Sequence, residues 1–156
     1  MPAPARSSIA PSTLGIDLVD EGVVVEYLDG RTTLYRGAPS AVDGKLVASP
    51  GKETHVLVTD PTETEGVMMY VNDLKTHDEI LEDTGVGRVI LESGDQEELF
   101  PGVAVRNASE RIEVEADPDA AGGRVFVFVE DDWGEQSYEI TSAPDHELGT
   151  FGQDES

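Results

Sequence analysis

Short runs of β-branched and aromatic residues, separated by turn signals about every dozen residues, constrain the fold of this chain most strongly. Residues 124–131 (RVFVFVED) are apolar on both faces, which is typical of a strand at the centre of a sheet. Residues 23–28 and 31–36 flank Asp29-Gly30, a dipeptide that suits the positive φ angles of a type I′ turn, so they predict a hairpin. The chain is therefore expected to be mainly β, an antiparallel sandwich or small barrel of roughly eight to ten short strands. The other runs that predict strands are residues 45–49, 54–60, 67–72, 87–92, 102–106 and 137–141.

Residues 112–116 alternate between apolar and acidic side chains. Ile112, Val114 and Ala116 share one face of the predicted strand, and Glu113 and Glu115 share the other. This period of two predicts a half-buried strand whose glutamates lie on the exposed face.

One segment departs from the strand pattern. Thr76-His77-Asp78-Glu79 matches a capping box, in which the threonine accepts from the amide of the glutamate and the glutamate reaches back. Ile80 and Leu81 supply an apolar edge, and Gly85 suits the position just after a helix. These residues predict one short helix near 77–83.

The chain is strongly acidic, with 33 acidic and 10 basic residues among 156 and a net charge of −23. Repulsion of this size destabilises a compact state in dilute buffer, and molar salt, with a Debye length of roughly 3 Å, removes most of it. The acids are spread along the whole chain, which favours adaptation to concentrated intracellular salt over a disordered acidic segment or a mimic of nucleic acid. We therefore expect folding to require high salt.

Basic residues form no cluster in the sequence. Arg106 and Arg111 come closest to a pair, and Glu110 stands beside them. Since nucleic-acid binding needs clustered lysines and arginines to neutralise phosphates, we expect no nucleic-acid partner.

The length suits one domain, and composition divides it into three parts. Residues 1–14 are expected to be a flexible arm, residues 15–142 a single β-rich domain, and residues 143–156 an acidic flexible tail. The chain has no cysteine, no export signal and no apolar run of the length that a membrane span needs, so we expect a cytoplasmic protein with no membrane contact. Without export, the sequon Asn107-Ala108-Ser109 is interpreted as accidental.

Two stretches carry a family resemblance. Residues 23–37 (VVVEYLDGRTTLYRG) and 72–107 (NDLKTHDEILEDTGVGRVILESGDQEELFPGVAVRN) resemble an uncharacterised family of small acidic haloarchaeal proteins, a domain of unknown function. The resemblance implies a salt-adapted cytosolic archaeal protein. It brings no catalytic motif to carry over.

Few residues are candidates for chemistry. Asp73, His77 and Asp78 combine an imidazole with carboxylates and are the candidate metal ligands, although no second histidine stands at ligand spacing, so solvated acids on a capped helix are the preferred interpretation. Residues 117–128 begin like a calcium loop, but Ala121 and Phe128 occupy ligand positions, so a β-turn is predicted there. We predict no cofactor.

Two further side chains, His55 and Trp133, are candidates for a role. His55 falls on the face of a strand and is expected to be a partly buried structural histidine. Trp133 lies in an acidic turn and is the candidate anchor for a partner, although burial over the end of a sheet is the preferred interpretation.

No set of residues matches a catalytic motif, so an enzyme is not expected. The leading hypothesis is a salt-adapted cytosolic β domain that acts as a protein-interaction or self-association module. The alternative is a small barrel that binds a small ligand or a divalent cation, with enzymatic activity left open.

Overall fold

Two sheets make up nearly all the regular structure of the chain. The computed structural model describes residues 6–9, 11–37, 39–48, 53–72, 84–108, 111–131 and 134–142. Within these residues it has fourteen strands and one helix of a single turn. The sheets pack as a sandwich and neither closes into a barrel, so the predicted fold class is confirmed in its sandwich form.

The larger sheet, sheet A, follows the order β4-β3-β2-β8-β7-β13-β14-β5, with β9 paired to β8 and β1 paired to β9. Its pairings are antiparallel except β8 with β9 and β14 with β5, which are parallel. Its strands are β1 (Arg6–Ile9), β2 (Thr13–Val19), β3 (Gly22–Glu26), β4 (Thr32–Arg36), β5 (Ser40–Asp43), β7 (Glu53–Thr59), β8 (Glu65–Asn72), β9 (Gly87–Ile90), β13 (Val125–Asp131) and β14 (Gly134–Ser142).

The smaller sheet, sheet B, is fully antiparallel and follows the order β10-β11-β12-β6. Its strands are β6 (Lys45–Ala48), β10 (Gln96–Phe100), β11 (Val103–Asn107) and β12 (Ile112–Ala116). Ile112, Val114 and Ala116 face sheet A in a shared core, as their spacing predicts.

Strand β13 serves two cores because it is apolar on both faces. Val125, Val127 and Val129 belong to the core between the two sheets. Phe126 and Phe128 belong to a second core, on the opposite face of sheet A, which β2 and β3 cover. The prediction of a central strand is confirmed.

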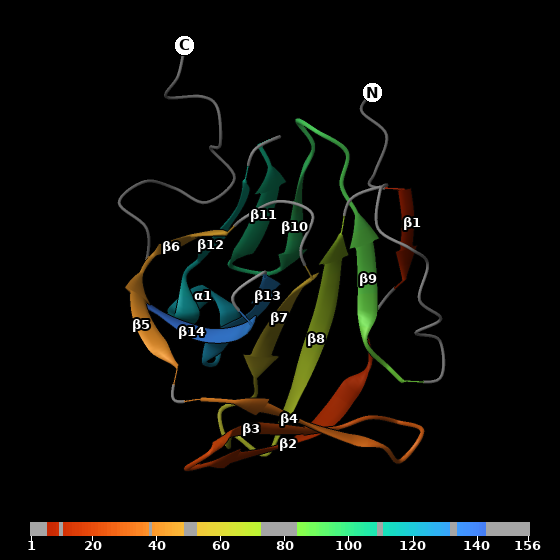
Figure 1. Cartoon of the computed structure of the whole chain (residues 1–156), viewed down its shortest axis with the longest axis vertical. Coiled ribbons are helices and arrows are strands. Elements are labelled where there is room, and N and C mark those ends of the chain that lie inside the picture. The colour runs from red at the N-terminus through yellow and green to blue at the C-terminus, as the bar shows by residue number, and fades with distance from the viewer. Residues whose placement is uncertain are drawn as a thin grey trace.

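Sheet A bends so that its first strands lie across its own middle strands. Figure 1 shows β2, β3 and β4 crossing the lower ends of β7, β8 and β9. The free end of this arm approaches β14, where the Ser137 hydroxyl donates a 3.2 Å hydrogen bond to the Arg36 carbonyl. The second core is therefore enclosed between two parts of one sheet.

The predicted hairpin around Asp29-Gly30 is confirmed, but its turn differs from type I′. Only Gly30 has a positive φ in this turn, 92°. The Gly30 amide donates to the Tyr27 carbonyl and the Tyr27 amide donates to the Arg31 carbonyl. This is a type I turn followed by a left-handed glycine, which is the usual solution for a slightly longer loop.

Several elements were not predicted as they stand. Strands β1, β5 and β10 have no continuous apolar run, and pairing with a neighbour rather than local pattern makes them strands. In β2, Leu14, Ile16 and Leu18 alternate as in a half-buried strand, a pattern that the sequence prediction missed. Within the predicted arm 1–14, β1 pairs with β9 and Leu14 is buried. The predicted helix 77–83 and the tail 143–156 lie outside the described residues.

A single-turn helix, α1 (Pro118–Ala121), replaces the predicted β-turn. Asp117 caps its start by accepting from the Asp119 and Ala120 amides, and Gly122 ends it in the left-handed conformation. No helix within the described part of the chain has the length and apolar character that crossing a membrane requires.

Candidate interaction surface

Sheet B turns one face toward sheet A and the other away from it. We call the second the sheet B outer face. Strand register places its residues in two rows. The rows are Lys45–Glu115–Ala104–Glu98 and Val47–Glu113–Arg106–Gln96.

Three basic side chains converge on one carboxylate of this face. Arg111 Nε donates to Glu113 Oε2 at 2.6 Å, and Lys45 Nζ lies 3.3 Å from Glu113 Oε1. Arg106 Nε lies 3.9 Å from the same Oε1. We call Lys45, Arg106 and Arg111 the cation cluster. The fold brings Lys45 to the pair Arg106 and Arg111 because β6 and β11 flank β12 on either side.

Glu113 is buried beneath these cations, with a side chain only 4% exposed. Its burial acts to raise the pKa, but the hydrogen bonds from Arg111 and Lys45 and the charges of Lys45 and Arg106 outweigh it, so the pKa lies below its usual value. Glu115 is buried as well. The prediction that both glutamates lie exposed is wrong: basic side chains from neighbouring strands cover Glu113, and Glu115 is buried on the same face.

Val47 gives the same face an exposed apolar residue. It is 51% exposed, beside Lys45 and Arg111 side chains that are 38% and 49% exposed. Among the described acids, its register neighbour Glu113 and the next β12 residue on this face, Glu115, are buried, whereas Lys45, Arg111 and Val47 itself reach solvent. This face therefore offers a partner an apolar contact at Val47 and positive charge at Lys45 and Arg111.

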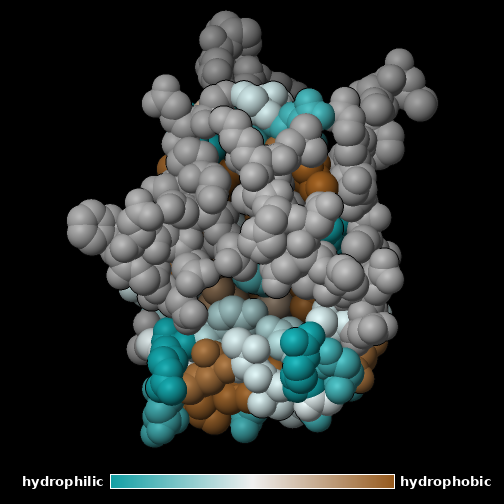
Figure 2. Space-filling model, turned by 45° about the vertical axis from the view of Figure 1, so that its right-hand side comes forward, coloured by the Kyte–Doolittle hydropathy of each residue, from teal (hydrophilic) through white to brown (hydrophobic). Residues whose placement is uncertain are grey.

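Apolar residues also reach the surface at the other end of the molecule. Figure 2 shows them toward the bottom, where β2, β3 and β4 lie, with hydrophilic residues on either side. Leu28 is 59% exposed and Val19 36% exposed there. Val19 is followed by the exposed acids Asp20 and Glu21, and Leu28 is followed by the exposed acid Asp29, so both apolar residues adjoin acidic side chains.

His55 lies in a cross-strand row of the second core. Its register neighbours are Phe128 on β13 and Tyr70 on β8. The imidazole stacks on Tyr70 with centroids 4.8 Å apart and meets the Tyr35 ring of the covering arm at 5.8 Å. Burial lowers the pKa of His55 to about 4, so the ring is neutral at pH 7. His55 is half-buried, and its ring lies against the aromatic rings of Tyr70 and Tyr35.

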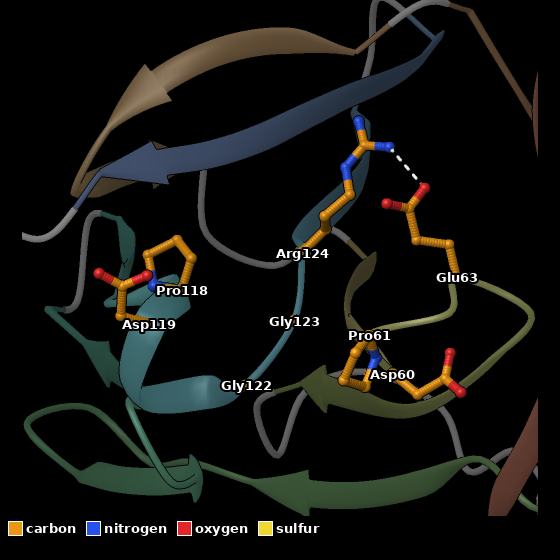
Figure 3. A pocket seen from close by; sticks show the side chains of 8 residues that line it. All are labelled: Asp60, Pro61, Glu63, Pro118, Asp119, Gly122, Gly123 and Arg124. Atoms are coloured by element: carbon orange, nitrogen blue, oxygen red, sulfur yellow. Dashed lines mark hydrogen bonds and ion pairs between the residues drawn. The ribbon is translucent and has the colours of Figure 1, made fainter.

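A niche of about 280 Å³ lies between the β7–β8 loop and α1. Arg124 borders it, with Nε and Nη2 bound to the two Glu139 carboxylate oxygens and Nη1 3.2 Å from Glu63 Oε1. In Figure 3, Glu63 reaches toward Arg124, whereas the carboxylates of Asp60 and Asp119 lie away from it. The guanidinium is therefore paired with two acids of its own chain.

Beside this niche, the backbone just before β13 packs closely against the end of β7. A Cβ on Gly123 would lie 1.8 Å from the Thr59 carbonyl oxygen, so only glycine fits there. The Thr59 hydroxyl, 2% exposed as a residue, accepts a 3.0 Å hydrogen bond from the Arg124 amide.

We expect Thr59→Val to lower the free energy of unfolding by about 1 kcal/mol, because it buries the Arg124 amide without its acceptor in nearly the same volume. Chemical denaturation in molar KCl measures this change. Thr32→Val, on the exposed edge strand β4, is the matched control and should have little effect. An equal loss in both variants would assign the cost to the general change rather than to the hydrogen bond.

Most of the candidate site residues from the sequence lie outside the part of the chain that the structure describes. Asp73, His77, Asp78 and Trp133 all fall outside the described residues. Among the residues that are described, no three histidine, cysteine or acidic side chains are grouped as metal ligands. The Asn107 amide nitrogen donates to the Leu91 carbonyl and the residue is 4% exposed, so the sequon has no accessible acceptor nitrogen.

The sequence predicted only part of the cation cluster. The pair Arg106 and Arg111 was evident, but Lys45 is far from it along the chain and joins it only through the pairing of β6 with β12. Glu113, predicted as solvated, is the carboxylate that gathers them.

Comparison with known proteins identifies a family whose function is unknown. A family model described as a family of unknown function (DUF5796) matches residues 2–141. No curated protein and no solved structure matches the chain.

Proposed function

The chain belongs to the DUF5796 family, whose function is unknown, and we propose that it is a non-enzymatic β domain that binds a protein partner through the sheet B outer face. The partner surface that fits is acidic. The charge of the chain and its resemblance to small haloarchaeal proteins support a salt-rich archaeal cytoplasm as the place of work.

One observation carries the proposal, the cation cluster beside exposed Val47. Three of the ten basic residues of the chain meet on this face, and the acid between them is buried. The two rows and Arg111 together hold three basic and three acidic residues, so the face is neutral on a chain of net charge −23. An acidic partner that docks here meets basic side chains at contact distance, the range at which molar salt screens charge least.

The alternative of a ligand enclosed in a barrel has less support. The sheets do not close, and the niche near Arg124 is lined by acids, prolines and glycines rather than by convergent apolar side chains. His55 does not line that niche.

A photo-crosslinking residue placed at position 47 tests the proposal in cells lysed at native salt. We expect a defined cross-linked partner whose attached peptide, identified by mass spectrometry, is acidic. In the Arg111→Glu background its yield should fall about tenfold, the effect of losing about 1.4 kcal/mol of contact energy.

The matched control carries the same cross-linker at position 28, which is similarly exposed but lies at the acidic end of the molecule. Equal yields of the same product from both positions would contradict the proposal. So would a yield from position 47 that Arg111→Glu leaves unchanged.

A further inference from the structure

Strand β6 forms an edge of sheet B. It pairs with β12 on one side and stands last in the order β10-β11-β12-β6. An edge strand offers backbone donors and acceptors to any extended chain that lies beside it. The direction of each backbone group of β6 decides what such a chain would meet.

Register and one hydrogen bond fix those directions. The Ala116 amide donates to the Gly44 carbonyl at 3.0 Å, so Gly44 and Ala116 are a hydrogen-bonded pair. Such pairs alternate along an antiparallel ladder. Leu46 therefore directs its backbone groups to β12, and Val47 directs its N–H and C=O away from β12, toward the edge. No described residue makes a backbone hydrogen bond to Val47 on that side.

We propose that an extended acidic segment of the partner adds to β6 as an antiparallel strand, paired to the backbone of Val47. This inference rests on the proposed function and names how the partner binds. An antiparallel addition continues the pattern of sheet B, in which every pairing is antiparallel.

The side chains of β6 specify the sequence of that strand. The residue opposite Val47 lies on the outer face and contacts an exposed valine, so it is apolar. The next residue lies opposite Leu46, on the side of the shared core, and is apolar as well. The third lies opposite Lys45 on the outer face and is acidic. The partner therefore carries an apolar-apolar-acidic triplet in an extended segment.

Two arrangements of a second copy fit an extended sheet B less well. Two β6 strands paired about a two-fold axis bring no acid opposite Lys45, because Lys45–Ala48 contains none. A head-to-tail copy would place its β10 against β6. Glu97 of β10 is opposite Val105, so it faces the core side, and the ladder shifts register between Glu98 and Phe100. An inward acid and a bulge at an edge strand act against pairing with another strand. A separate acidic segment is therefore the occupant that we propose.

Fluorescence anisotropy with labelled five-residue peptides tests the inference on the full chain in molar KCl. The probe is Thr-Val-Val-Glu-Thr, and the comparison peptide replaces its Glu by Lys. We expect the probe to bind at least tenfold more tightly. The Lys45→Glu variant should instead prefer the Lys peptide. Binding of that peptide would also show that the variant is folded.

A modified peptide and a protein variant test the backbone pairing. Methylation of the probe amide opposite Val47 removes its donor. Val47→Pro removes the edge-facing N–H of Val47, while the ladder to β12 keeps its bonds. Each should abolish binding. Leu28→Asp, at the other end of the molecule, should leave the affinity unchanged.

Three results would overturn strand addition: no binding of either peptide by the unmodified chain, an unchanged preference in Lys45→Glu, or equal binding of the methylated probe. Cross-linking at position 47 does not depend on backbone pairing. A defined acidic partner in that experiment together with any of these results would reject the mode of binding and leave the interaction surface in place.

Discussion

In millimolar salt the chain is expected to lose its β circular-dichroism signal, and molar KCl is expected to restore it. The net charge of −23 repels itself over long distances in dilute buffer, and molar salt screens all interactions beyond roughly 3 Å. The ion pairs on Glu113 oppose this trend, since salt weakens them. They are contacts of 2.6 to 3.9 Å at a buried carboxylate, and such pairs are screened far less than exposed charges. Relief of the charge repulsion therefore outweighs the weakening of these ion pairs, and added salt stabilises the fold.

A neutral solute at equal osmolality serves as the control, because it is excluded from the protein surface but does not screen charge. It should restore less structure than KCl. A chain that is equally folded at both extremes of salt would contradict the adaptation that we infer from its composition.

Acid is expected to destabilise the native protein through His55. The pKa of this imidazole is lowered from 6.5 to about 4 by burial, so between these values the unfolded chain binds a proton that the folded chain does not. His55 therefore does not destabilise the native state well above pH 6.5, and its destabilising effect grows as the pH drops from 6.5 toward 4. Full burial would make the loss about 3 kcal/mol, and because the ring is only half-buried we expect about 2 kcal/mol.

Denaturation of wild type and His55→Gln at pH 7 and pH 4.5, in molar KCl, measures this loss. The variant should lack the additional decrease, because glutamine does not titrate. Three carboxylates have a lowered pKa: Asp29, Asp60 and Glu113. Their protonation destabilises the fold only as the pH falls below the usual pKa values of these groups, and it does so equally in wild type and variant. Parallel decreases in the two proteins would show that His55 keeps its ordinary pKa.

Sequence patterns predicted those parts of the fold that local physics determines. The run 124–131 is apolar on both faces, and a strand with two apolar faces has to be covered twice, as β13 is by its two cores. The alternation at 112–116 correctly placed Ile112 and Val114 inside. Strands such as β10, in a segment interpreted as an acidic link, form because β11 offers an edge, which no local window contains.

The interaction surface could be predicted only in part, for a similar reason. Burial of Glu113 depends on Lys45 and Arg106, which lie on the two strands that flank β12. A period of two assigns a side chain to a face, but it does not say whether long basic side chains cover that face. The exposure of Val47 follows from the place of β6 at the end of the order, which is likewise a property of the whole sheet.

Residue-resolved NMR tests the central claim, that the chain binds through the sheet B outer face. The full chain in molar KCl is titrated with Thr-Val-Val-Glu-Thr while amide shifts are followed. We predict that the largest shifts fall on Lys45, Val47 and Arg111, with the Val47 amide also protected from hydrogen exchange. Shifts centred on Leu28 and Val19 at the β2–β4 end, with β6 unchanged, would contradict the account.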